Sequence, residues 1–91
     1  MDFEWDQGKS DKNLRERGVG FDFAALIFDG PVIERTDSRK NYGEVRIQGI
    51  GVAEGIILTV IYTDRGEVRR IISARPASKK ERNAWQSFVN H

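Results

Sequence analysis

The chain has 91 residues with a net charge of +1, of which 38% are hydrophobic and 32% charged, so we expect one small domain over residues 1–91. It has no cysteine, and its single histidine is the terminal His91. This composition excludes a disulfide scaffold, a thiolate zinc site and a cysteine nucleophile, and it argues against a histidine metal site. No apolar run approaches the ~20 residues that span a bilayer. The acidic start, MDFEWD, lacks the regions of a signal peptide. We therefore expect a soluble cytoplasmic protein with no metal or other cofactor.

The charges are unevenly distributed along the chain. Residues 64–91 hold seven basic and three acidic side chains, a net charge of +4, which leaves −3 for residues 1–63. Such an asymmetry indicates a polyanionic partner. The alternative is that these basic residues are simply solvated surface.

The first third of the chain predicts a short edge strand and two helices. Residues 3–5 alternate as a strand with Trp5 turned into the core. Asp6 and Gly18 are suitable caps for a polar helix between them. An apolar i, i+3, i+4, i+7 pattern then predicts a second helix over residues 21–28, ended by Gly30-Pro31. One side of the polar helix carries Lys9, Lys12, Asn13 and Arg17.

The remainder predicts a loop, three strands and a helix. Residues 34–41 are polar and read as a loop, and residues 44–50 alternate as a strand. Glycines bound a hairpin loop at residues 51–55, and the apolar run at residues 56–62 is typical of a central strand. A strand over residues 67–75 completes an antiparallel meander. The last helix is expected to bury Ala84, Trp85, Phe88 and Val89 on one side.

These elements give an α+β fold class. We expect a small antiparallel sheet, made of the meander plus one or two short N-terminal strands. Two N-terminal helices and one C-terminal helix pack around it.

The final strand leads directly into the last helix. Strand alternation places Arg69, Ile71, Ser73 and Arg75 on one face. Pro76 ends the strand, and Ser78 with Glu81 forms a capping box that begins the helix. Arg75 is therefore expected beside a helix N-terminus, where a phosphate binds well.

Several segments together resemble a known family. In order they are FEWD, Lys9 with Asn13, RGVGF, FDGP, Glu44-x-Arg46, VIYTDRG and RIISARPASKKER. They resemble the BrnT toxins, the ribonuclease half of a type II toxin–antitoxin pair, whose fold is like that of the RelE toxins. The resemblance covers nearly the whole chain, and the ISAR strand end with its basic capped helix is its most specific part.

The resemblance implies RNA cleavage that shuts down translation. It implies neutralisation by a BrnA-like antitoxin of the ribbon-helix-helix type, so that operator DNA is contacted only through the antitoxin. Family members often carry a basic-His-Gly sequence where this chain has Arg15-Glu16-Arg17-Gly18. Arg17 in the histidine's place argues against proton transfer there and leaves charge stabilisation intact.

Metal-independent RNA cleavage through a 2′,3′-cyclic phosphate needs a base, an acid and cations around the phosphate. Arg75 is the first candidate for the scissile phosphate, and Arg46 is the second because it could meet Arg75 across the sheet. Glu44 and Glu81 are the candidate bases, although the capping box already explains Glu81; a lysine of lowered pKa is the alternative base. The remaining candidates for RNA binding are Arg69, Ser73, Lys9, Lys12, Arg17, Lys79 and Arg82.

A competing interpretation is a catalytically weak or inactive module that binds RNA or a partner on the same fold. The missing histidine favours it, and steep salt dependence of RNA binding without strand scission would distinguish it. Tyr62 stays undecided between the core and stacking on a base. We find no DNA-binding motif in the chain itself.

Overall fold

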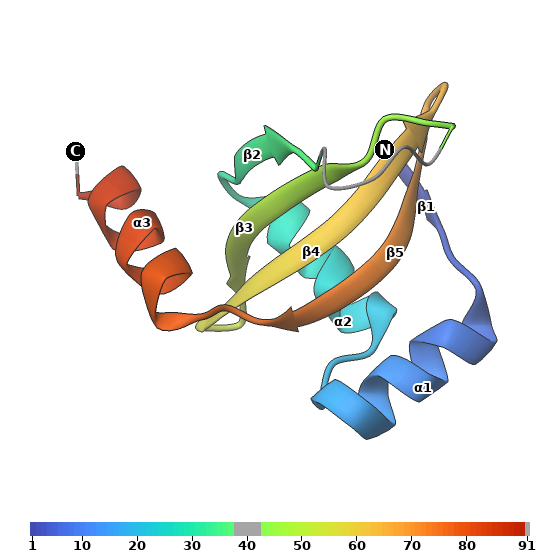
Figure 1. The fold of residues 1–91 in the computed structure, drawn as a ribbon, viewed down its shortest axis with the longest axis horizontal. Helices are drawn as coiled ribbons and strands as arrows, with labels where there is room; N and C mark the ends of the chain where they lie inside the picture. Colours follow the sequence, from blue (N-terminus) through green and yellow to red (C-terminus); the bar gives the residue numbers. More distant parts are fainter. Residues whose placement is uncertain (38–42, 91) are drawn as a thin grey trace.

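The computed structural model describes residues 1–37 and 43–90 (Figure 1). The described part of the chain forms, in order, β1 (Asp2–Glu4), α1 (Gln7–Arg17), α2 (Phe21–Ala24), the 3₁₀ helix η1 (Ala25–Asp29), β2 (Ile33–Thr36), β3 (Ile47–Ala53), β4 (Ile56–Arg65), β5 (Val68–Pro76) and α3 (Lys79–Val89). The predicted α+β class and the three helices are confirmed.

The described strands form one sheet in the order β1-β5-β4-β3-β2, with β4 at its centre. Neighbours from β2 to β5 are antiparallel. The expectation of a wholly antiparallel sheet is wrong, because β1 pairs in parallel with β5. The sheet is therefore mixed. A parallel pair needs a long crossover rather than a hairpin, and the chain between β1 and β5 provides one.

Helix α1 begins and ends where its caps predict. The Asp6 side chain accepts a hydrogen bond from the backbone N–H of Lys9 at 2.9 Å, and Gly18 adopts the left-handed conformation with φ of 76°. Asn13 does not join a basic flank. Its side-chain amide donates to the carbonyls of Val19 and Ala74, at 2.7 Å each, and so ties α1 to β5.

The second predicted helix is divided into α2 and η1, which lie across one face of the sheet (Figure 1). This close packing explains a wrong strand boundary. A Cβ atom on Gly51 would lie 2.9 Å from Cβ of Ile27 in η1. Gly51 is therefore a strand residue that lets η1 approach, and β3 runs through it rather than ending at residue 50.

The loop predicted at residues 51–55 shrinks to a two-residue turn. Glu54 and Gly55 both have positive φ, at 47° and 82°. Two consecutive positive values are typical of the type I′ turn, whose twist matches that of the flanking strands. The loop predicted at residues 34–41 is also partly wrong, since residues 34–36 belong to β2. Residues 38–41 of that loop lie outside the described residues.

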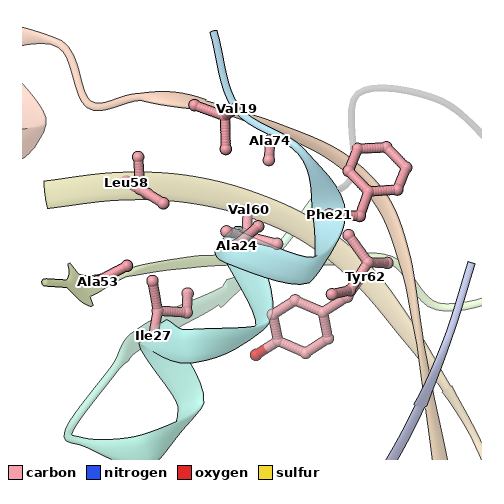
Figure 2. Packing of buried hydrophobic residues seen from close by; sticks show 10 residues of the cluster. Val19, Phe21, Ala24, Ile27, Ala53, Leu58, Val60, Tyr62 and Ala74 are labelled. Carbon is pink, nitrogen blue, oxygen red and sulfur yellow. The ribbon is translucent and has the colours of Figure 1, made fainter. Parts of the chain in front are cut away.

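The core lies between α2–η1 and one face of the sheet. Figure 2 shows Ala24 beside Val60 of β4 and Ile27 beside Ala53 of β3. Tyr62 is completely buried, which settles it as a core residue. Trp5 is partly buried against this core, as predicted, and its indole N–H donates to Gln7 at 3.0 Å.

Helix α3 begins with the predicted capping box. The Ser78 backbone N–H donates to Glu81 at 2.8 Å, and the Glu81 N–H donates to the Ser78 hydroxyl at 3.2 Å. The expected buried side is largely wrong. Trp85 is buried, whereas Ala84, Phe88 and Val89 are exposed. The helix meets β3 and β4, and in Figure 1 it extends away from the sheet.

Candidate nucleic-acid interface

The sheet has a second face, opposite α2 and η1. Leu58, Val60 and Tyr62 of β4 point into the core, so strand alternation turns the residues between them to the other side. We call this side the second face. Following the strand pairing, it carries Arg35, Gln48, Ile50, Thr59, Ile61, Thr63, Arg70, Ser73 and Arg75.

A β-bulge in β5 decides which arginines reach the second face. Ser73 pairs with Ile61, but Ile71 pairs with Tyr62, so Ile72 is an extra residue. Arg69 therefore lies on the core side and Arg75 on the second face. The predicted common face of Arg69, Ile71, Ser73 and Arg75 is wrong, because the bulge reverses the alternation between residues 71 and 73.

Arg75 lies at the start of α3, as predicted, but a carboxylate already holds it. Its guanidinium donates two hydrogen bonds to Glu81, at 2.6 and 2.8 Å. The bond from Arg75 lowers the pKa of Glu81 to about 2. Glu81 is therefore ionised at neutral pH and also accepts from Ser78, which makes it a poor candidate for the base.

A second group of charges gathers at the other end of the face, and we call it the arginine cluster. Its members, drawn from β1, β4, β5 and the segment before β3, are Glu4, Glu44, Arg46, Arg65 and Arg70. The guanidinium nitrogens of Arg65 lie 3.3 Å from a carboxylate oxygen of Glu44 and 3.9 Å from one of Glu4. The nitrogen-to-oxygen distance is 3.7 Å from Arg70 to Glu4 and 3.8 Å from Arg46 to Glu44.

These ion pairs are long, and their side chains are partly exposed. Such pairs contribute about 0–1 kcal/mol each and give way readily to a better partner. All members of the cluster except Glu4 line a pocket of about 240 Å³, which Lys9 and Asp6 also line. The pocket therefore places several cations around a space where an anion can enter.

The two predicted arginines of the site do not meet. Arg46 precedes Ile47, which pairs with Tyr62, so Arg46 lies level with Thr63. Arg75 pairs with Thr59, four residues away along β4. At ~3.3 Å per residue, this places the two positions roughly 13 Å apart along the strand. The expected contact of Arg46 with Arg75 across the sheet is wrong.

Arg69 is held on the core side of the sheet. It donates to Asp64 at 2.7 and 2.9 Å, and its guanidinium carbon lies 4.7 Å and 4.4 Å from the ring centres of Phe28 and Tyr62. The hydrogen bond raises the pKa of Arg69 and lowers that of Asp64. These contacts explain Arg69 as a structural residue.

The Tyr62 side chain, whose ring lies under the Arg69 guanidinium, also has a structural hydrogen bond. It donates a hydrogen bond to the carboxylate of Glu34. Burial, together with this bond, raises the pKa of Tyr62 above its ordinary value. The phenol therefore stays protonated at neutral pH and acts as a donor to Glu34.

The other predicted RNA-binding residues are spread over the surface. Lys12 and Arg17 are exposed on α1, and Lys79 is exposed at the start of α3. Arg82 donates to the carbonyl of Ala77 at 2.8 Å. Ser73 is half-buried on the second face. Of this group, only Lys9 joins the pocket at the arginine cluster.

Sequence reasoning missed Glu4, Arg65 and Arg70 as members of one cluster. Arg65 and Arg70 contributed only to the net charge, and nothing in the sequence indicated that β1 pairs with β5. That pairing sets Glu4 opposite Arg70. Within residues 1–37 and 43–90, no three histidine, cysteine or carboxylate side chains lie close enough to hold a metal ion. In the same ranges, no helix has the length and apolarity to cross a bilayer.

Residues 5–81 match the model of a family described as the ribonuclease toxin, BrnT, of type II toxin–antitoxin systems. The matched range includes Glu44, Arg46, Arg65 and Arg70. A search of curated proteins found no match.

Proposed function

Because the chain belongs to the BrnT family of ribonuclease toxins of type II toxin–antitoxin systems, we propose that it is a metal-independent endoribonuclease whose active site is the arginine cluster. It cuts RNA to leave a 2′,3′-cyclic phosphate and thereby inhibits translation. A BrnA-like ribbon-helix-helix antitoxin neutralises it and carries the contact with operator DNA.

The convergence of three arginines around one pocket supports this proposal most directly. Arg46, Arg65 and Arg70 share the carboxylates of Glu4 and Glu44 through ion pairs of 3.3 to 3.9 Å. A phosphate offers a guanidinium shorter, bidentate, charge-assisted bonds. RNA can therefore replace the long ion pairs with stronger ones and set its phosphate beside Glu44.

The proposed reaction uses groups already at the pocket. Glu44 takes the proton from the 2′-hydroxyl, and the 2′-oxygen attacks the phosphorus. The arginines stabilise the charge that develops on the phosphorane. The bond to the 5′-oxygen breaks, and Lys9 protonates that oxygen, which leaves the cyclic phosphate. Carboxylates are weak bases at neutral pH, so we expect slow turnover unless the ribosome orders the substrate.

The test is cleavage of end-labelled RNA in excess EDTA by the wild type, Arg46→Ala and Glu44→Gln. We expect a cyclic phosphate end from the wild type. Loss of one transition-state cation should lower kcat/KM by about 100-fold or more, and loss of the base by a similar factor. Arg15→Ala removes an arginine of α1 outside the pocket and should leave cleavage unchanged.

Ribosomes are added if free RNA stays intact. Intact RNA in both conditions would reject the ribonuclease and leave the alternative, a module that binds RNA or a partner without cutting. Within the described part of the chain, the lining of the pocket contains no histidine, the usual general base at neutral pH, and this favours that alternative. Equal cleavage by the wild type and Arg46→Ala would instead move the active site away from the cluster.

A further inference from the structure

Helix α3 exposes an apolar side that the sheet does not cover. Trp85 is only 6% exposed, whereas Phe88 and Val89 are 46% and 43% exposed. The ring of Phe88 packs against Trp85, with 5.7 Å between centroids. Ala84 lies one turn before Phe88 and is also exposed. The helix thus presents an apolar strip beside its buried tryptophan.

The strip adjoins a groove between α3 and the second face of the sheet. We call it the α3 groove. It has a volume of about 230 Å³, and its apolar lining comes from Ile33, Ile50 and Ala84. Arg35 and Lys80 also line it. The carboxylate in the lining, Glu81, is already bound to Arg75. The groove therefore combines an apolar floor with cationic sides.

We propose that the α3 groove and the adjoining strip bind an amphipathic segment of the antitoxin, with its apolar side chains in the groove and its acidic ones facing Arg35 and Lys80. A type II toxin has a protein antitoxin, so the family supplies a partner. Charge complementarity with Arg35 and Lys80 favours an acidic segment of that antitoxin as the one that binds the groove. Stable interfaces bury at least ~1,000 Å², so the segment must extend from the groove onto Phe88 and Val89.

The location also gives a means of neutralisation. Glu81 lines the groove, and its partner Arg75 lies on the second face that also carries Arg70. A segment seated in the groove covers the Arg75 end of that face. It thereby obstructs RNA that reaches the arginine cluster along the sheet. This blocking step rests on the proposed function, whereas the docking itself rests only on family membership.

The experiment measures binding of the antitoxin from the toxin's own operon, purified separately, by isothermal titration calorimetry. The toxin variants are Ala84→Arg, which fills the groove, and Phe88→Asp, which places a charge on the strip. Leu14→Asp is the matched control, because Leu14 is 55% exposed on α1. We expect both variants of α3 to weaken binding by about 100-fold, and Leu14→Asp to leave it unchanged.

A charge variant tests the acidic complement. Lys80→Glu should weaken binding by about tenfold at low salt, and the loss should shrink as salt is added. Circular dichroism checks that each variant is folded. The α3 variants should cleave RNA as the wild type does without antitoxin, and they should resist inhibition when it is present.

Unchanged affinity in Ala84→Arg and Phe88→Asp would overturn the proposal, as would an equal loss in Leu14→Asp. Sedimentation that shows wild-type toxin self-associating, and Phe88→Asp not, would assign the strip to a second toxin copy instead. Absence of RNA cleavage and loss of antitoxin binding are separate outcomes of these experiments. A toxin that does not cleave RNA, yet loses antitoxin binding only in the α3 variants, would keep the docking site and reject the enzyme.

Discussion

Glu81 shows how a single side chain can serve two structural purposes at once. It completes the capping box with Ser78 and also accepts both hydrogen bonds from Arg75. The residue thus joins the end of β5 to the first turn of α3. The position of Glu81 in the sequence, beside a basic strand end, equally predicts a role at a phosphate site. Only the side-chain geometry distinguishes the structural role from that one.

The pH dependence of stability tests this structural role. The pKa of Glu81 is lowered to about 2 from its ordinary 4.5. Its ionised form therefore stabilises the fold fully above about pH 4.5, and this contribution is lost as the pH falls toward 2. Glu81→Gln should lower the free energy of unfolding by about 1–3 kcal/mol at pH 7 and by much less near pH 2.

Urea unfolding, followed by circular dichroism at pH 7, 4 and 2.5, measures this difference against the wild type. Glu16→Gln changes an exposed glutamate of α1 and should show no such trend. A Glu81→Gln deficit that stayed constant from pH 7 to pH 2.5 would contradict the pairing with Arg75.

At the scale of elements, the packing of η1 on β3 depends on a glycine. Gly51 lies inside β3, and a Cβ there would meet Ile27 Cβ at 2.9 Å and the Ile27 carbonyl oxygen at 3.4 Å. Neither the backbone of Ile27 nor its branched Cβ atom can easily move aside. The strand residue therefore has to lack a side chain for α2 and η1 to cover the sheet closely.

Gly51→Ala should accordingly destabilise the protein by about 1–3 kcal/mol, the usual cost of overpacking a core. Thermal unfolding measures the change. Gly30→Ala is the control, because no atom lies within 4 Å of a Cβ placed there and its φ is negative. Equal melting temperatures for Gly51→Ala and the wild type would show that η1 can shift without cost.

Local signals in the sequence predicted most elements well. The caps Asp6 and Ser78 fix the starts of α1 and α3, because capping is a contact within one turn. Gly51 led to a wrong predicted end of β3, because a glycine in a turn and a glycine packed under a helix cannot be distinguished in the sequence. The bulge at Ile72 was equally invisible, because an extra strand residue depends on the partner strand.

At the scale of the whole molecule, the fold reduces the charge asymmetry that the sequence shows. Basic residues of the C-terminal third pair with acidic residues from earlier in the chain. Glu4 lies 3.9 Å from Arg65 and 3.7 Å from Arg70, and Glu44 lies 3.3 Å from Arg65. Glu44 and Arg46 were both candidate catalytic residues from the sequence, where they lie two residues apart. The sequence could not predict Glu4, whose place depends on the pairing of β1 with β5.

If the arginine cluster is the RNA site, as proposed, Glu4 competes with the RNA phosphate for Arg65 and Arg70. Glu4→Gln removes the carboxylate that Arg65 and Arg70 share and leaves both arginines in place. We expect RNA to bind about three- to tenfold more tightly at low salt. The slope of log affinity against log salt should also become steeper, because each additional phosphate contact contributes about 0.7 to it for single strands. Fluorescence anisotropy of labelled RNA at several salt concentrations measures both.

A higher net charge would by itself strengthen RNA binding, so the control variant must raise the net charge by the same amount. Glu16→Gln raises the net charge by the same amount from an exposed position on α1, outside the residues that form the arginine cluster. If the gain in affinity and slope occurs in Glu4→Gln and not in Glu16→Gln, the phosphate binds at the cluster. The same gain in both variants would show that RNA responds only to overall charge, and the arginine cluster would then lose its place as the RNA site.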